Sequence, residues 1–185
     1  QHTVESLSRT VAEKVTAIVD NHSIAMLEEA GLPANSSEPF PPGGIRPEKL
    51  THELYRHYGA LMVLDDVKDD RRKVIQRAID VVARSLIQQR ERVHDLSFKL
   101  VEEQVLKLCP ETVHPDEWDL DGLEAVLLER FKIKADLRNI QDIDKLVDRV
   151  WKQVELLLTT REQEFGLYTF LFYVRQFYLE EIDEQ

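Results

Sequence analysis

The hydrophobic positions of the chain recur mostly at steps of three and four residues, the spacing of one face of an α-helix. The first such segment follows Thr3, a residue type that caps helices, and is predicted to run to about Ala30. Gly31 and Pro33 predict its end, because glycine accepts the left-handed backbone that closes a helix and proline cannot continue one. Residues 31–46 contain four prolines and three glycines and are predicted to form a loop and a mobile connection.

A second amphipathic helix is predicted to begin at Pro47 and to continue through Gly59. Its apolar face would hold Leu50, Leu54, Tyr58, Leu61 and Met62. From Val67 to Leu108 the sequence has neither glycine nor proline, which predicts one long helix with the polar run 88–92 as the place for any kink. A helix of that length exceeds the diameter of a small domain, so we interpret it as a spine or as the arm of a hairpin.

A short helix ending near Phe131 is predicted after a loop that contains Pro110 and Pro115. Asp119 is a suitable N-cap for this helix. Trp118, directly before the cap, can pack against Leu123 and so fix the direction in which the chain enters the helix. Residues 132–141 show no periodicity and are predicted to be irregular.

The last helix is predicted to begin after Asp142, as its N-cap, and to run to the end of the chain, over residues 143–185. Aromatic residues crowd its second half, at Phe165, Tyr168, Phe170, Phe172, Tyr173, Phe177 and Tyr178. They point to more than one face of a single helix, and such a helix is buried on several sides or lacks a partner. We therefore predict that neighbouring helices converge here or that the isolated chain forms a homodimer through this surface. With no alternating strand pattern anywhere, the predicted fold class is all-α.

The composition excludes several classes of function. The chain has 24 basic and 35 acidic residues, a net charge of −11, which repels phosphate backbones and makes nucleic acid an unsuitable partner. Cys109 is the single cysteine, so the sequence predicts neither a disulfide framework nor a thiolate metal site, and a reducing, cytosolic location fits. No run of 18 apolar residues and no signal peptide pattern is evident, so we expect no membrane-spanning segment.

The sequence offers no candidate catalytic, cofactor-binding or metal-binding residue. No glycine-rich phosphate loop and no Gly-x-Ser-x-Gly motif is present. Two Glu-x-x-His pairs, Glu91 with His94 and Glu111 with His114, have the spacing used in di-iron four-helix bundles. The second pair lies between two prolines and the first lies in a polar stretch, so we interpret both as solvated surface pairs and disfavour a di-iron enzyme.

Three segments resemble one protein family. Residues 117–123 read Glu-Trp-Asp-Leu-Asp-Gly-Leu and resemble the Trp-Asp-x-x-Gly-Leu segment in the wing of the SecA preprotein translocase motor. Residues 161–166 and 178–183 resemble the start and continuation of its returning scaffold helix. Residues 65–75 are similar to a Tyr-Asp-Asp-Val-x-x-x-x-Arg-Lys-x-Ile stretch on its long scaffold helix, with Leu64 in place of the aromatic residue. Residues 1–50 show no resemblance.

The resemblance implies long scaffold-type helices with a small helical wing subdomain. The implied segments are an unassigned part at 1–46, hypothetically a lineage-specific insertion, a scaffold-like part at 47–108, a wing-like part at 109–142 and a returning long helix at 143–185. The family hydrolyses ATP with magnesium in domains that this sequence lacks, so the implied role is non-catalytic: coupling motor movement to the handling of preprotein. The implied partners are other domains of the motor, preprotein and the membrane channel, and the implied location is cytoplasmic with peripheral association to the inner membrane.

A second hypothesis from another class stays open. A free-standing helical module for protein–protein interaction or dimerisation explains the periodicity and the acidity equally well. On either hypothesis, the candidates for structural or interaction roles are Trp118, Leu123 and the seven aromatic residues between 165 and 178. A phosphate-binding loop in the sequence that precedes this chain would decide for the motor.

Overall fold

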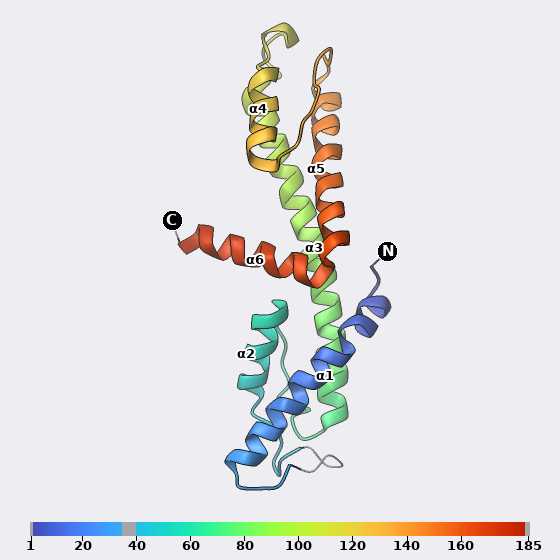
Figure 1. The fold of residues 1–185 in the computed structure, drawn as a ribbon, viewed down its shortest axis with the longest axis vertical. Coiled ribbons are helices and arrows are strands. Elements are labelled where there is room, and N and C mark those ends of the chain that lie inside the picture. The colour runs from blue at the N-terminus through green and yellow to red at the C-terminus, as the bar shows by residue number, and fades with distance from the viewer. Residues whose placement is uncertain (1, 35–39, 184–185) are drawn as a thin grey trace. The chain divides into compact units, whose positions relative to one another are not determined.

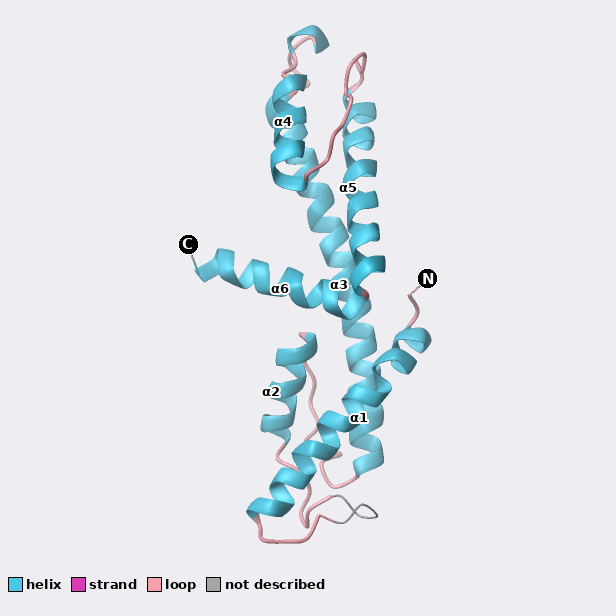
Figure 2. Ribbon diagram, in the orientation of Figure 1, coloured by secondary structure: helices cyan, strands magenta, loops and turns pink. Residues whose placement is uncertain are grey.

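The computed structural model describes residues 2–34 and 40–183, with side chains as far as Gln176. These residues form helices joined by loops and contain no strand, so the predicted all-α fold class is confirmed for the described part of the chain (Figure 2). The elements are α1 (Val4–Glu29), α2 (Pro47–Tyr58), α3 (Arg71–Leu108), the short 3-10 helix η1 (Pro115–Glu117), α4 (Leu120–Phe131), α5 (Ile143–Phe165) and α6 (Leu167–Asp183) (Figure 1).

The chain divides into two compact units, which are described separately. The first unit comprises residues 1–89 and 171–185, and the second comprises residues 90–170. The boundary falls within two helices, so α3 and α6 each contribute residues to both units.

In the first unit, α1 begins and ends where the sequence predicts. The Thr3 hydroxyl accepts a hydrogen bond from the backbone of Ser6, and the Ser6 side chain caps the Thr3 N–H in return. Its buried apolar face consists of Leu7, Val11, Val15, Ile18, Val19 and Leu27. Asp20 on this helix accepts two hydrogen bonds of 2.8 Å from the Arg71 guanidinium, which ties α1 to the start of α3.

Helix α2 ends earlier than the sequence suggests. Leu50, Leu54 and Tyr58 form its buried face as predicted, but the predicted continuation to Met62 is wrong. Gly59 adopts the left-handed conformation with φ of 65°, and its N–H closes the helix on the Tyr55 carbonyl at 2.7 Å. The residues that follow it are not helical, and the Leu61 side chain is 80% exposed.

Helix α3 is a single helix of 38 residues, about 57 Å long at a rise of about 1.5 Å per residue. It continues through residues 88–92, which confirms the prediction of one long helix. It begins at Arg71 and not at Val67, because the Asp70 carboxylate accepts the Lys73 N–H at 3.2 Å and so caps the helix. The residues before the cap form turns, including one closed by the Val67 N–H on the Leu64 carbonyl at 3.1 Å.

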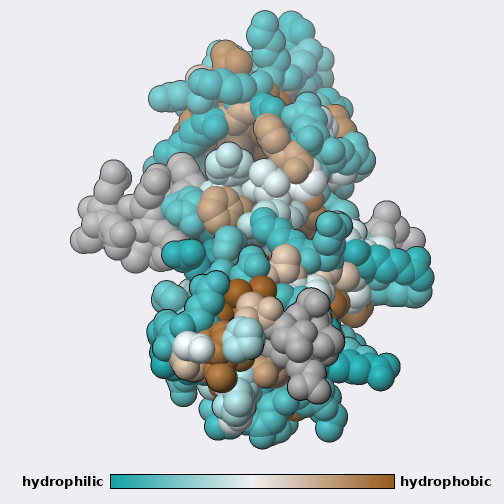
Figure 3. All heavy atoms as spheres, turned by 60° about the horizontal axis from the view of Figure 1, so that its bottom comes forward, coloured by the Kyte–Doolittle hydropathy of each residue, from teal (hydrophilic) through white to brown (hydrophobic). Residues whose placement is uncertain are grey.

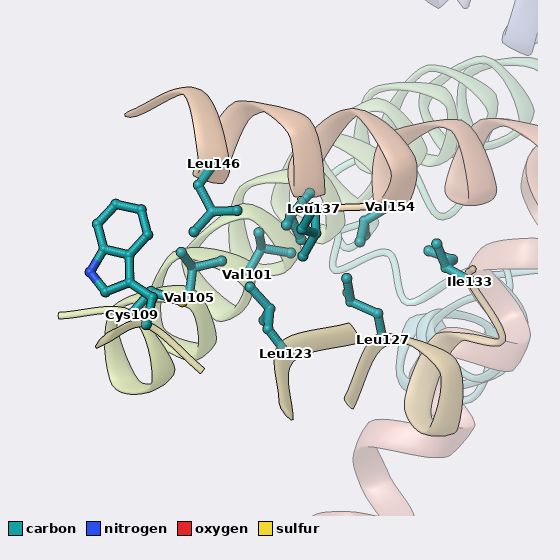
Figure 4. Packing of buried hydrophobic residues seen from close by; sticks show 11 residues of the cluster. Val101, Val105, Cys109, Leu123, Leu127, Ile133, Leu137, Leu146 and Val154 are labelled. Carbon is teal, nitrogen blue, oxygen red and sulfur yellow. The ribbon is translucent and has the colours of Figure 1, made fainter. Parts of the chain in front are cut away.

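The second unit is built around a core between the C-terminal half of α3, α4, α5 and the segments that join these helices (Figure 4). Its buried members are Val101, Val105, Cys109, Trp118, Leu123, Leu127, Ile133, Leu137, Leu146, Val150 and Val154. The irregular segment at 132–141 is confirmed. The Asp142 carboxylate accepts the backbone N–H groups of Asp144 and Lys145, which confirms it as the N-cap of α5.

The predicted single helix over residues 143–185 is wrong, because the structure interrupts it at Gly166. This glycine has φ of 78° and ψ of 152°, a conformation outside the helical region that side chains with a Cβ rarely adopt. Helix α5 therefore ends at Phe165, and α6 starts afresh with the Phe170 N–H on the Gly166 carbonyl at 3.0 Å.

Hydrophilic residues cover much of the surface visible in Figure 3, with apolar side chains between them. The large apolar side chains with the greatest exposure are Leu61, Val63, Leu156 and Tyr173. Among the described residues, none of the helices has the length and apolar character needed to cross a membrane.

Candidate functional site

The Trp-Asp-x-x-Gly-Leu segment forms the corner at which the chain enters α4. Trp118 is 9% exposed and belongs to the same buried cluster as Leu123 and Leu127. Its indole Nε1 donates a hydrogen bond of 3.0 Å to the Pro110 carbonyl. The Asp119 N–H donates to the Leu108 carbonyl at 3.2 Å. The corner is thereby fixed both to the core and to the end of α3, and a role of Trp118 in binding another molecule stays a prediction.

The spacing of Asp119 and Gly122 has a direct physical reason. The Asp119 Oδ1 atom accepts the Gly122 N–H at 2.9 Å, the hydrogen bond of a helix N-cap. A Cβ atom at position 122 would lie 2.1 Å from the other carboxylate oxygen of Asp119. Any side chain there would displace the cap, so the Asp-x-x-Gly pattern is explained by this local geometry.

The structure distributes the predicted aromatic residues over two helices. Phe170 is buried, Tyr168 and Phe172 are half-buried, and Phe165 and Tyr173 are 52% and 64% exposed. The side chains of Phe177 and Tyr178 lie outside the described residues. Because Gly166 separates α5 from α6, the faces expected for one continuous helix do not apply to this set.

A polar cluster in the first unit, here called the Arg175 cluster, escaped the sequence analysis. Arg175 on α6 donates to the carbonyls of His57 and Tyr58 at 2.9 Å each and to the Gln89 side chain at 2.7 Å. Gln89 on α3 donates in turn to the Tyr58 carbonyl at 2.8 Å and to the Ser85 hydroxyl at 2.9 Å. The Arg175 cluster consists of the side chains of Arg175, Gln89 and Ser85 and the carbonyls of His57 and Tyr58.

The Arg175 cluster satisfies the end of α2. The last carbonyls of a helix have no partner within it, and a positive charge there interacts favourably with the negative end of the helix dipole. A Cβ at Gly59 would lie 2.9 Å from the Arg175 side chain, so this glycine also leaves room for the arginine. One guanidinium thereby connects α2, α3 and α6 within the first unit.

Arg90, which follows Gln89 on α3, connects α3 to α5 in the second unit. The Arg90 Nε atom lies 3.0 Å from each carboxylate oxygen of Glu162 on α5, and Glu162 is 5% exposed. A buried carboxylate is costly unless it is paired, so this ion pair restricts how α5 can lie along α3.

The interpretation of Glu91 and His94 as a solvated pair is wrong for the histidine. His94 is half-buried, and its ring packs edge-on with Trp151 at a centroid distance of 6.3 Å. Burial is the main cause that lowers its pKa, with the charge of Arg90 next. Glu91 is exposed, as predicted. Among the described residues no group of three or more potential ligands is arranged for a metal ion.

The remaining candidates have local structural roles. The His114 Nδ1 atom accepts the Asp116 N–H at 3.2 Å and caps η1. Cys109 is fully buried, and burial raises the pKa of its thiol, with the charge of Asp119 adding to the effect. A raised pKa keeps the sulfur protonated near neutral pH, which is unsuited to a nucleophile.

The fold and these contacts define an all-helical structural module for the described residues, in which α3 contributes residues to both units. The family model for the SecA wing and scaffold domain matches residues 53–185, and the chain belongs to this family. The resemblance noted in the sequence is therefore confirmed.

The matched relatives are protein translocase subunits several times longer than this chain. The chain is similar to protein translocase subunit SecA of Sorangium cellulosum, with 27% identity over 74% of this chain and 14% of the relative. It is 29% identical to SecA of Syntrophus aciditrophicus over 93% of this chain and 20% of the relative, a match that extends upstream of residue 53. With SecA of Desulforamulus reducens it shares 31% identity over 76% of this chain and 16% of the relative. No solved structure matches. The chain thus spans about a fifth or less of these relatives.

Proposed function

We propose that this chain is the non-catalytic helical scaffold and wing portion of a SecA-type protein translocation motor, and that it couples movement of the motor to the handling of preprotein. The observation that carries the proposal is the match of the family model over residues 53–185. The relatives named above are protein translocase subunits several times longer than this chain, which leaves room for the domains that perform the ATP hydrolysis.

The structure supports a mechanical role through the long helix α3. Rigid elements with fixed contacts are the parts of a protein through which a displacement in one place biases another. Gln89 and Arg90 are consecutive residues of α3, and each is held by a partner distant in sequence, Arg175 in the first unit and Glu162 in the second. A shift of α6 or α5 along α3 would break these contacts, and losing hydrogen bonds and ion pairs of partly buried groups costs free energy.

The proposal extends to partners, cofactors and location. ATP and magnesium would bind in the other domains of the motor, and this chain would hold no cofactor of its own. Its partners would be those domains, the preprotein and the membrane channel. The whole motor would work in the cytoplasm with peripheral attachment to the inner membrane.

The test uses the intact motor that contains this chain, reconstituted with its channel in membrane vesicles. Translocated preprotein and ATP hydrolysed are measured in the same sample, for Arg175→Ala and for the control Arg84→Ala. Arg84 lies on α3 and, within the part of the chain that the structure describes, pairs only with Asp80 one turn away, on the exposed surface. We expect ATP hydrolysis to persist in both, and the yield of preprotein per ATP to fall several-fold for Arg175→Ala alone. Equal yields in the two variants would contradict the coupling role.

The exposed apolar side chains of the first unit support the second candidate, a module for protein–protein interaction or dimerisation. Leu61 and Val63 are 80% and 68% exposed and Tyr173 is 64% exposed, and exposed apolar surface often marks an interaction site. The two functions are compatible, since a scaffold within a motor also meets other domains.

A further inference from the structure

A shallow groove of about 410 Å³ lies between α3 and α5 in the second unit. It is lined by His94, Asp95, Phe98, Lys99, Trp151 and Glu155. Trp151 packs against the core of this unit, whereas Asp95, Phe98 and Glu155 belong neither to that core nor to the Arg90–Glu162 pair.

Three rings surround one side of the groove. Trp151 on α5 meets Phe98 at a centroid distance of 5.4 Å and an interplanar angle of 90°. The Trp151 ring also contacts His94, which lies one turn before Phe98 on α3, at a centroid distance of 6.3 Å and an interplanar angle of 82°. Aromatic faces carry a negative electrostatic potential that attracts cations, most strongly for tryptophan. Solvent reaches both rings of this pair, because Trp151 is half-buried and Phe98 is 37% exposed.

The charged groups of the groove favour a cationic occupant. Asp95 on α3 and Glu155 on α5 are exposed, and no cation among the described residues forms an ion pair with either. Among the described residues, Lys99 is the only cation that lines the groove, so the two carboxylates of the groove leave an excess of negative charge. The net charge of −11 on the whole chain acts in the same direction.

His94 does not oppose a cation at neutral pH. Burial and the charge of Arg90 lower its pKa, although Glu162, Glu155 and Asp95 act in the other direction. Its ring is therefore neutral near pH 7 and adds aromatic surface without a repelling charge. Its Nε2 atom is buried and has no hydrogen-bond partner in the described structure, so the ring contributes by packing.

We propose that this groove binds an arginine side chain of a basic peptide, with the guanidinium over Trp151 and between Asp95 and Glu155. A guanidinium suits it better than an ammonium, because it is planar, weakly hydrated, able to stack on a ring and able to donate to two carboxylates at once. The proposal does not depend on the translocation role, since it follows from the residues of the groove alone.

The chain provides its own reporter for a binding test. It contains two tryptophans, Trp118 and Trp151, so the Trp118→Phe variant retains one indole, located in the groove. This variant is titrated with a capped peptide in which arginine alternates with glycine, and separately with the same peptide carrying glutamine in place of arginine. We expect a saturable change in Trp151 fluorescence with the arginine peptide and none with the glutamine peptide. Calorimetry on the unaltered chain measures the same affinity independently of that substitution.

Two matched variants locate the site. Asp95→Asn with Glu155→Gln removes both carboxylates of the groove, and we expect about fivefold weaker binding. Glu117→Gln with Glu129→Gln removes the same charge from exposed positions that do not line the groove, and its affinity should change less than twofold. Trp151→Leu should abolish measurable binding.

Three results would overturn the proposal. The first is the absence of saturable binding by calorimetry. The second is an equal loss in the groove variant and in the control, which would show attraction to net charge alone. The third is tighter binding of a matched lysine peptide than of the arginine peptide, which would contradict guanidinium stacking.

Discussion

Arg90 and Glu162 lie 72 positions apart in the chain, yet the Nε atom of Arg90 is 3.0 Å from each carboxylate oxygen of Glu162. The carboxylate is 5% exposed while the arginine side chain is 33% exposed, so one end of the pair reaches solvent. Attraction within such a pair offsets the cost of burying the carboxylate, and removing Arg90 takes away the charge that offsets this cost.

We expect Arg90→Leu to lower the free energy of unfolding by about 2 kcal/mol. This lies below the usual cost of breaking a buried pair, about 3–5 kcal/mol, because solvent screens the accessible end. Replacing both Arg90 and Glu162 by leucine should cost less than Arg90→Leu alone. The control Arg84→Leu breaks an exposed pair and should cost about 0.5 kcal/mol. Urea denaturation measures all four proteins, and equal losses for the two arginines would contradict this account.

The entry corner of α4 should depend on the volume of Trp118 more than on its hydrogen bond. Trp118→Ala removes a buried indole, and we expect a loss of about 3 kcal/mol. Trp118→Phe retains most of the volume but leaves the Pro110 carbonyl without its donor, and we expect a loss of about 1 kcal/mol. Urea denaturation distinguishes the two, and a loss below about 1 kcal/mol for the alanine variant would show that the indole is not an anchor.

The Asp119 cap and Gly122 should behave as one unit. Asp119→Ala removes the cap, and Gly122→Ala places a Cβ 2.1 Å from the capping carboxylate, so each should cost about 1 kcal/mol. The double variant should cost little more than either single one, because the same hydrogen bond can be lost only once. A double-mutant cycle by thermal denaturation tests this, and additive losses would show that the two residues act separately.

Stability should fall in mild acid because of His94. Its pKa is lowered in the folded protein, so the unfolded chain binds a proton more readily. The stabilising contribution is present above the unfolded pKa of 6.5 and is lost as the pH falls through the lower folded pKa. His94→Gln removes this titration, while His22 and His57, whose pKa values burial also lowers, remain in both proteins. Between pH 7 and pH 5 we expect the free energy of unfolding to fall less for His94→Gln than for the unaltered chain. An equal fall in the two proteins would contradict this role of His94.

The sequence predicted the features that are decided within a few residues. The caps at Thr3, Asp119 and Asp142 depend on one side chain and the next backbone turn, and all three occur as expected. The long helix α3 follows equally from an unbroken run of helix-compatible residues. The helix ends at Gly59 and Gly166 were missed, because a glycine within an apolar pattern is compatible both with a weakened helix and with a break.

The contacts of Gln89 with Arg175 and of Arg90 with Glu162 could not be predicted from one sequence. Gln89 and Arg90 stand in a polar run, which is typical of a solvated face, and their partners Arg175 and Glu162 lie 86 and 72 positions away. Nothing local distinguishes a paired arginine from an exposed one. One signal in the sequence was that the polar run 88–92 stands on a helix whose apolar face continues before and after it.

The aromatic residues of α6 differ in exposure, which decides which of them can mediate self-association of the isolated chain. Phe170 is 8% exposed and therefore belongs to the core, whereas Tyr173 is 64% exposed on the same helix. Leu61 and Val63 add further apolar surface in the first unit. We expect a two-fold dimer at micromolar concentration, because closed symmetric pairs are the commonest way to cover such surface.

Light scattering of the unaltered chain and of two aspartate variants tests this expectation. Tyr173→Asp should give a folded monomer, because the substitution adds charge to a surface that the dimer would bury. Phe170→Asp should instead lose helical signal in circular dichroism, since a carboxylate would be forced into the core. A chain that is monomeric before substitution would contradict self-association. A dimer unaffected by Tyr173→Asp would move the interface away from this helix, where Leu61→Asp with Val63→Asp tests the other exposed segment.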